Sequence, residues 1–159
     1  MTERRYWLVK SEPETFSWDD LWRAPKRTTS WEGVRNYQAR NMLRDQLKKG
    51  DGVLFYHSST GIPAVKGIAE VAREGYPDPT AFDRKSDYYD PRSDPSAPAW
   101  FTVDVRAVEP LARPVELPEL RRTPGLEKMT LLQKGSRLSV QPVSPAEWRI
   151  VTALGKRAR

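Results

Sequence analysis

Cysteine is absent from this 159-residue chain, and histidine occurs only once, at His57. These scarcities exclude disulfides, cysteine nucleophiles and zinc sites built from cysteine or from several histidines. The chain also lacks a glycine-rich phosphate loop and a Gly-x-Ser-x-Gly nucleophile motif. A magnesium or calcium ion held by carboxylates stays open, although the aspartates between residues 78 and 94 lack the spacing of a calcium loop. We therefore expect no metal and no cofactor.

Long hydrophobic runs are missing as well. No stretch approaches the roughly 18 consecutive apolar residues of a membrane-spanning helix, and the first seven residues lack the features of a signal peptide. We therefore predict a soluble intracellular protein with no membrane partner, located in the cytoplasm, at a nucleoid, or in the nucleus of a eukaryote. A chain of this length is enough for one domain with a core and too short for two ordinary domains with separate cores, so we expect a single domain over residues 1–159, acting as a monomer.

The charge of the chain is positive, with a formal net charge of +6. Arginine outnumbers lysine 18 to 9, and the guanidinium fork matches phosphate oxygens two at a time. This favours nucleic acid as the partner, although a genomic base composition that favours arginine codons would give the same excess. Arg35, Arg40 and Arg44 recur near helical spacing and are predicted to contact phosphates, with a solvated helix face as the alternative.

Hydrophobic periodicity and turn residues predict an α+β fold. Strands are expected over residues 6–9, 52–57, 64–72, 100–108 and 137–143. Helices are expected over residues 18–22, 34–49, 117–122 and 126–134, and a last one from Pro145, capped by Ser144 and Glu147. Residues 76–98, rich in proline and aspartate, are predicted to form a long loop. The result is a small barrel of about six mostly antiparallel strands with short helices packed outside.

His57 could belong to a catalytic triad or could have a structural role. His57 is followed by Ser58 and Ser59, and Asp51 or Asp104 could orient its imidazole. A lone histidine at a strand end is more often a hydrogen-bonding or packing residue than a catalyst. We therefore favour the structural interpretation and expect no catalytic residue.

Aromatic and polar residues gather at predicted strand ends. The segments Lys10-Ser11-Glu12 and Tyr56-His57-Ser58 each close a strand, and Trp31 precedes a helix among polar neighbours. Flat rings for stacking, beside polar groups that read edges, are typical of nucleobase recognition. The other five tryptophans are expected in the core.

The chain resembles a known family at these residues. The matching segments, which run from the first strand to the last, are residues 6–13, 31–41, 55–58, 76–78, 80–83, 88–91 and 135–143. They resemble the EVE domain of the PUA-like superfamily, which includes the thymocyte nuclear protein group. In that family asparagine is usual in the turn after the second matched strand, where Ser59-Thr60-Gly61 stands here.

The resemblance implies a PUA-like pseudobarrel with a pocket for a modified nucleobase, such as a methylated base, similar to the YTH domains. By position, Lys10 and Ser11 resemble the residue pair that ends the first strand, and Trp31 resembles the first wall of an aromatic cage. Tyr56, Tyr88 and Tyr89 are the candidates for the second wall. The other base-contacting candidates, from the strand ends and the resemblance together, are Glu12, Asn36, His57, Ser58, Arg137 and Ser139.

These observations predict a non-catalytic module that reads a modified base in DNA or RNA. Two alternatives stay open: a nucleotide- or base-processing hydrolase of the PUA-like superfamily, and a protein-interaction adaptor whose basic surface is incidental.

Overall fold

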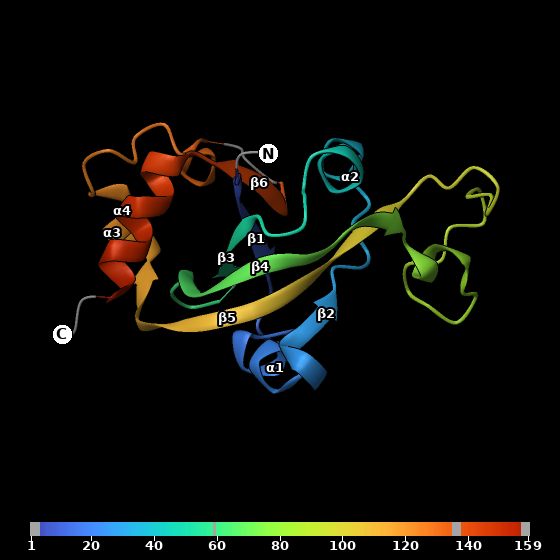
Figure 1. Cartoon of the computed structure of the whole chain (residues 1–159), viewed down its shortest axis with the longest axis horizontal. Helices are drawn as coiled ribbons and strands as arrows, with labels where there is room; N and C mark the ends of the chain where they lie inside the picture. Colours follow the sequence, from blue (N-terminus) through green and yellow to red (C-terminus); the bar gives the residue numbers. More distant parts are fainter. Residues whose placement is uncertain (1–3, 59, 135–137, 157–159) are drawn as a thin grey trace.

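The computed structural model describes residues 4–58, 60–134 and 138–156. One six-stranded sheet organises them, with the strand order β2-β5-β4-β3-β1-β6 (Figure 1). The strands are β1 (Tyr6–Ser11), β2 (Thr28–Ser30), β3 (Gly52–His57), β4 (Ala64–Pro77), β5 (Phe101–Glu116) and β6 (Val140–Val143). The helices are α1 (Trp18–Arg23), α2 (Tyr37–Asp45), α3 (Leu117–Arg121) and α4 (Pro145–Lys156). Short 3₁₀ turns occupy Pro25–Arg27, Pro79–Phe82 and Thr130–Leu132.

The sheet is mixed, with one parallel pair. Strands β1 and β3 run parallel, and every other pairing is antiparallel. A parallel pair needs a crossover connection, and here α1, β2 and α2 lie between the two strands. Irregular register between β4 and β5 marks bulges, which bend a sheet. Six mostly antiparallel strands with short helices outside confirm the predicted fold class.

Two hydrophobic cores cover the two faces of this sheet. Successive side chains of a strand point to opposite faces, so Trp7 and Val9 of β1 enter one core while Leu8 enters the other. Helices α1 and α2 contribute buried residues to the first core, and α3 and α4 contribute buried residues to the second. Of the residues between β1 and β3, the two helices therefore pack on the first core, while β2 joins the edge of the sheet beside β5.

Most predicted elements are confirmed, but several of their boundaries are wrong. Strand β5 continues through Pro110 and Pro114 to Glu116, whereas the sequence predicted its end at residue 108, and the three-residue β2 was missed. Helix α2 begins only at Tyr37, because the side chain of Asn36 caps it by accepting from the N–H of Ala39 at 3.0 Å. The last strand begins at Val140, so Leu138 and Ser139 of the predicted strand lie outside it, and Arg137 falls outside the described residues.

The helix predicted over residues 126–134 is wrong. Only Thr130–Leu132 form a 3₁₀ turn there. Successive turns, closed by hydrogen bonds from the N–H of Leu126 to the Thr123 carbonyl and from the N–H of Met129 to the Leu126 carbonyl, bury Leu126 and Met129. The side chain of Gln133 donates to the carbonyls of Glu127 and Met129. The Gln133 amide thus satisfies the Glu127 carbonyl and adds a second donor to the Met129 carbonyl, which also accepts from the N–H of Leu132.

The last helix begins as predicted. The N–H of Ser144 donates to the Glu147 carboxylate at 2.9 Å, and the N–H of Glu147 donates to Ser144 Oγ at 3.1 Å. This reciprocal capping box fixes the start of α4. Among the described residues, no helix is long and apolar enough to cross a membrane.

The contact between Gly67 and Trp18 offers a test of the first core. A Cβ built on Gly67 would overlap the Trp18 ring, whereas one built on Gly61 would meet nothing within 4 Å. We expect Gly67→Ala to lower the free energy of unfolding by about 1–3 kcal/mol, because added volume in a packed core forces side chains to shift. Urea unfolding measures this, with Gly61→Ala as the matched control. Equal stability of the two variants would contradict the packing described here.

Candidate functional site

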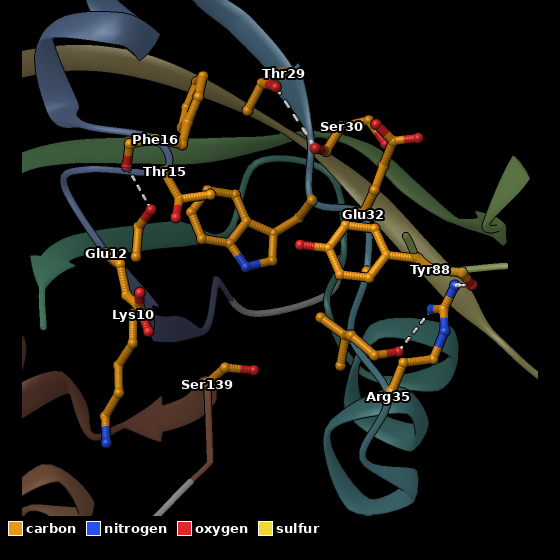
Figure 2. A pocket seen from close by; sticks show the side chains of 14 residues that line it. Lys10, Glu12, Thr15, Phe16, Thr29, Ser30, Glu32, Arg35, Tyr88 and Ser139 are labelled. Atoms are coloured by element: carbon orange, nitrogen blue, oxygen red, sulfur yellow. Dashed lines mark hydrogen bonds between the residues drawn. The ribbon is translucent and has the colours of Figure 1, made fainter. Parts of the chain in front are cut away.

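A cavity of about 630 Å³ lies at the end of β1 where that strand meets the segment after β2 (Figure 2). Its volume falls within the range of small-ligand pockets. Seven of its lining residues were predicted from the sequence: Lys10, Ser11, Glu12, Trp31, Arg35, Tyr88 and Ser139. Figure 2 shows Tyr88, Ser139 and the pair Lys10 and Glu12 around the cavity on different sides.

Trp31 is held rigidly where it lines the cavity. Its N–H donates to the Val103 carbonyl on β5 at 2.8 Å, and its ring meets Phe55 edge to face, with centroids 5.6 Å apart. Only 9% of Trp31 is exposed, so it belongs to the first core as well as to the cavity. The core therefore fixes the ring in place before any ligand arrives.

Tyr88 lies on the other side, on the loop that follows Pro79–Phe82. Its ring packs on Gly33, where a Cβ would lie 2.6 Å from Tyr88 Cζ, and Gly33 has a φ of +84° that favours glycine. Of Tyr88, 42% is exposed, so this wall is more open to solvent than Trp31. Glycine at position 33 thus lets an exposed tyrosine ring reach the cavity.

Asp78 joins the two segments that carry these rings. Its fully buried carboxylate accepts hydrogen bonds from the N–H of Gly33 at 2.9 Å and from Nη1 of Arg35 at 3.1 Å. It also accepts from the N–H and the hydroxyl of Thr80, at 2.8 and 2.6 Å. Burial alone would raise the pKa of Asp78, but these hydrogen bonds lower it below its usual value. The carboxylate therefore stays ionised at neutral pH.

Arg35 extends the same link to Tyr88. Its Nη2 donates to the Tyr88 carbonyl at 2.6 Å and to the Thr80 hydroxyl at 3.3 Å. The guanidinium thus positions the backbone of the second aromatic wall. The sequence predicted a phosphate contact for Arg35, whereas its observed partners lie within the protein.

The polar lining offers hydrogen-bond acceptors. Ser11 Oγ donates its hydrogen to the Phe16 carbonyl at 2.5 Å, which leaves the oxygen lone pairs for a ligand. Burial raises the pKa of Glu32, helped by the charges of Asp78 and Asp104, and burial lowers the pKa of Lys10. Both shifts bring charged groups of the lining closer to neutrality.

Several predicted residues lie away from the cavity. Tyr56 is 3% exposed and packs in the second core, because it follows Phe55 on β3 and points to the opposite face. Tyr89 and Asn36 are not among the lining residues, and the side-chain oxygen of Asn36 caps α2. Arg137 lies outside the described residues.

His57 and Ser58 have structural contacts instead. His57 Nε2 accepts from the N–H of Trp18 at 3.0 Å, and the N–H of Ser58 donates to the Ser11 carbonyl at 2.9 Å. Burial lowers the pKa of His57, and the charge of Lys66 adds to the shift, which agrees with a neutral, accepting imidazole. Asp51 and Asp104, the two proposed orienting carboxylates, accept instead from Trp7 Nε1 and from the Tyr76 hydroxyl. The described residues therefore do not assemble the triad considered above.

The predicted basic stripe is engaged in internal contacts. Arg40 Nη1 donates to the Ala99 carbonyl at 2.6 Å, and Arg44 pairs with Asp45 at 2.7 Å. Neither residue lines the cavity. A phosphate contact by either one stays a prediction.

Half of the residues that line the cavity were not predicted from the sequence. The added residues are Thr15, Phe16, Thr29, Ser30, Glu32, Gly33 and Val34. Glu32, Gly33 and Val34 lie within the family-like segment around Trp31, so that segment as a whole was the available signal. The other four come from short segments with no distinctive pattern, and only the folded sheet brings them to the cavity.

Comparison with known proteins places the chain in a family. A family model described as the EVE domain matches residues 5–154. The chain belongs to the EVE domain family. Human thymocyte nuclear protein 1 is 40% identical to this EVE domain over 168 residues, covering 96% of this chain and 74% of the human one. These matches confirm the predicted family.

Solved structures agree with this assignment. A hypothetical protein from Leishmania major matches this EVE domain with a TM-score of 0.90 and 45% identity, covering 97% of this chain and 96% of that one. The human THYN1 protein in complex with 5-methylcytosine-containing DNA matches with a TM-score of 0.89 and 39% identity, covering 98% of this chain and 99% of that one.

The buried Asp78 carboxylate makes the stability of this EVE domain depend on pH. We expect Asp78→Asn to lower the free energy of unfolding at pH 7 by about 1.5–3 kcal/mol, the usual contribution of hydrogen bonds to a charged group. Because the folded pKa is lowered, this stabilisation is fully present above the ordinary aspartate pKa of about 4 and is lost as the pH falls through the folded value. Urea unfolding between pH 7 and pH 2 measures the difference between wild type and variant.

The control is Asp87→Asn, which changes an exposed aspartate on the same loop. A difference between wild type and Asp78→Asn that stays constant as the pH falls would contradict the role given to the carboxylate.

Proposed function

We propose that this EVE domain is a non-catalytic reader of a modified nucleobase in DNA or RNA, with 5-methylcytosine in DNA as the first candidate. The observation that carries the proposal is the cavity that Trp31 and Tyr88 line together. Aromatic rings at a fixed position stack on bases, because every base has a π-face. The base is extruded from a duplex or presented in a single strand, since a pocket of this size cannot take a base that stays paired.

Similarity to a DNA complex favours 5-methylcytosine. Human THYN1, which resembles this chain over nearly its whole length, has been solved in complex with 5-methylcytosine-containing DNA. The cavity also offers suitable chemistry, because the carboxylates of Glu12 and Glu32 can accept from the amino group of cytosine. Val34 supplies an apolar contact of the kind that suits a methyl group at C5.

The proposal includes no reaction on the base. His57, the single histidine of the chain, lies outside the cavity and already accepts from a backbone N–H. Among the described residues, no group of three or more histidine, aspartate or glutamate side chains is arranged to hold a metal ion. An intracellular location and a monomeric state remain part of the proposal, and the name thymocyte nuclear protein, carried by relatives, agrees with the former.

Selectivity for the methyl group has a limited size. Burying one added methyl contributes about 0.8 kcal/mol, which corresponds to about a fourfold preference. We therefore expect a 5-methylcytosine oligonucleotide to bind about fourfold more tightly than its unmethylated match, as measured by fluorescence anisotropy. Mass spectrometry of the recovered oligonucleotide should find the base unchanged. Equal affinity for the two oligonucleotides, or conversion of the base, would contradict the proposal.

The second aromatic wall can be removed without disturbing the core. Stacking contributes about 1–3 kcal/mol per base, so Tyr88→Ala should weaken binding of the methylated oligonucleotide by about 5-fold to 150-fold. Tyr89→Ala is the control, because it removes the neighbouring ring that does not line the cavity. If folded Tyr88→Ala binds as tightly as wild type, Tyr88 is not a stacking wall.

A further inference from the structure

A row of alternating rings and guanidinium groups leads away from the cavity. Starting at Tyr88, the Arg35 guanidinium lies 5.7 Å from the Tyr88 ring centroid and 5.2 Å from that of Trp100. The Trp100 ring stacks on Tyr37, with centroids 4.8 Å apart and an interplanar angle of 21°. The Arg40 guanidinium then lies 5.0 Å from the Tyr37 centroid. Arg35 therefore connects the cavity that it lines with the exposed residues at the start of α2.

Tyr37 is both exposed and held in place. It is 61% exposed, while Trp100 beneath it is 6% exposed. Trp100 Nε1 donates to the Asp90 carboxylate at 2.6 Å, which fixes the supporting ring. Tyr37 is also the first residue of α2, whose start is capped by Asn36. A ring that is already ordered loses little conformational freedom when a ligand stacks on it.

Arg40 adds a cation beside this ring. Its Nη1 and Nε donate to the Ala99 carbonyl and to Asn41 Oδ1, at 2.6 and 2.8 Å. Within residues 4–58, 60–134 and 138–156, no carboxylate forms an ion pair with Arg40, and its Nη2 has no hydrogen-bond acceptor. An exposed aromatic ring next to a guanidinium with a free N–H group matches the two parts of a nucleotide, the base and the phosphate.

We propose that Tyr37 and Arg40 form a second nucleotide subsite, which holds the nucleotide next to the modified one. Tyr37 stacks on the base of that neighbour, and Arg40 contacts its phosphate. This inference rests on the proposed function, since it assumes that a modified base occupies the cavity. Because stacking does not depend on base identity, the subsite adds affinity for a strand without adding a sequence preference.

Two ligands separate this subsite from the cavity. The first is 5-methyl-2′-deoxycytidine monophosphate, which is too short to occupy the cavity and the subsite at once and whose binding is followed at residues of the cavity. The second is a five-nucleotide single strand with 5-methylcytosine in the centre. Tyr37→Ala should weaken the five-nucleotide ligand by about 5-fold to 150-fold and leave the monophosphate within about twofold of wild type. NMR titration measures both affinities, and Tyr37→Phe, which keeps the ring, should bind both ligands like wild type.

Tyr88→Ala serves as the comparison variant, because it should weaken both ligands. The subsite is overturned if folded Tyr37→Ala binds the five-nucleotide strand like wild type, or if it weakens both ligands equally. Tyr37→Leu keeps apolar bulk without a π-face and should behave like Tyr37→Ala, even if the alanine variant does not fold. If Tyr88→Ala binds both ligands like wild type while Tyr37→Ala loses the strand, the proposed cavity function fails, and with it the subsite as a neighbour of a bound base.

Discussion

The buried carboxylate of Asp78 is the contact on which the candidate site depends. It binds the backbone of Gly33, the guanidinium of Arg35 and both donors of Thr80, and so connects the segment after β2 with the segment after β4. Each segment carries one of the proposed aromatic walls. A buried carboxylate is stable in its charged form only when hydrogen-bond donors satisfy its oxygens, which explains why so many donors converge on Asp78. The cavity is therefore shaped by a polar centre, whereas the cores on the two faces of the sheet are apolar.

The parts of the fold that the sequence predicted well are the ones that local chemistry determines. Helix α4 has its capping residues within four positions, and β1 and β3 are short runs of strongly strand-forming residues. The errors occur where distant contacts outweigh local signals. Strand β5 passes through Pro110 because its long antiparallel pairing with β4 tolerates bulges. Residues 126–134 were predicted to be helical, yet side-chain hydrogen bonds and burial select turns.

In the candidate site, too, the residues that local patterns mark could be predicted, and those that distant contacts place could not. Lys10, Ser11 and Trp31 could be named in advance, because they lie at element ends within a recognisable local pattern. The choice among Tyr56, Tyr88 and Tyr89 could not be made. Tyr56 faces the second core because side chains alternate along β3. Tyr88 is held at the cavity by the hydrogen bond from Arg35 to its carbonyl, which joins residues 53 positions apart in the chain. Such a contact has no signature in a single sequence. The role of Asn36 also depends on where α2 begins, a boundary that periodicity alone placed too early.

The proposed reader function requires that a modified base enters the cavity between Trp31 and Tyr88. The most direct test is an NMR measurement of intermolecular nuclear Overhauser effects in the complex with a 5-methylcytosine oligonucleotide. We predict contacts from the C5-methyl protons to ring protons of both Trp31 and Tyr88. Contacts from that methyl group only to residues outside the cavity, with the base still paired or stacked in its strand, would contradict it.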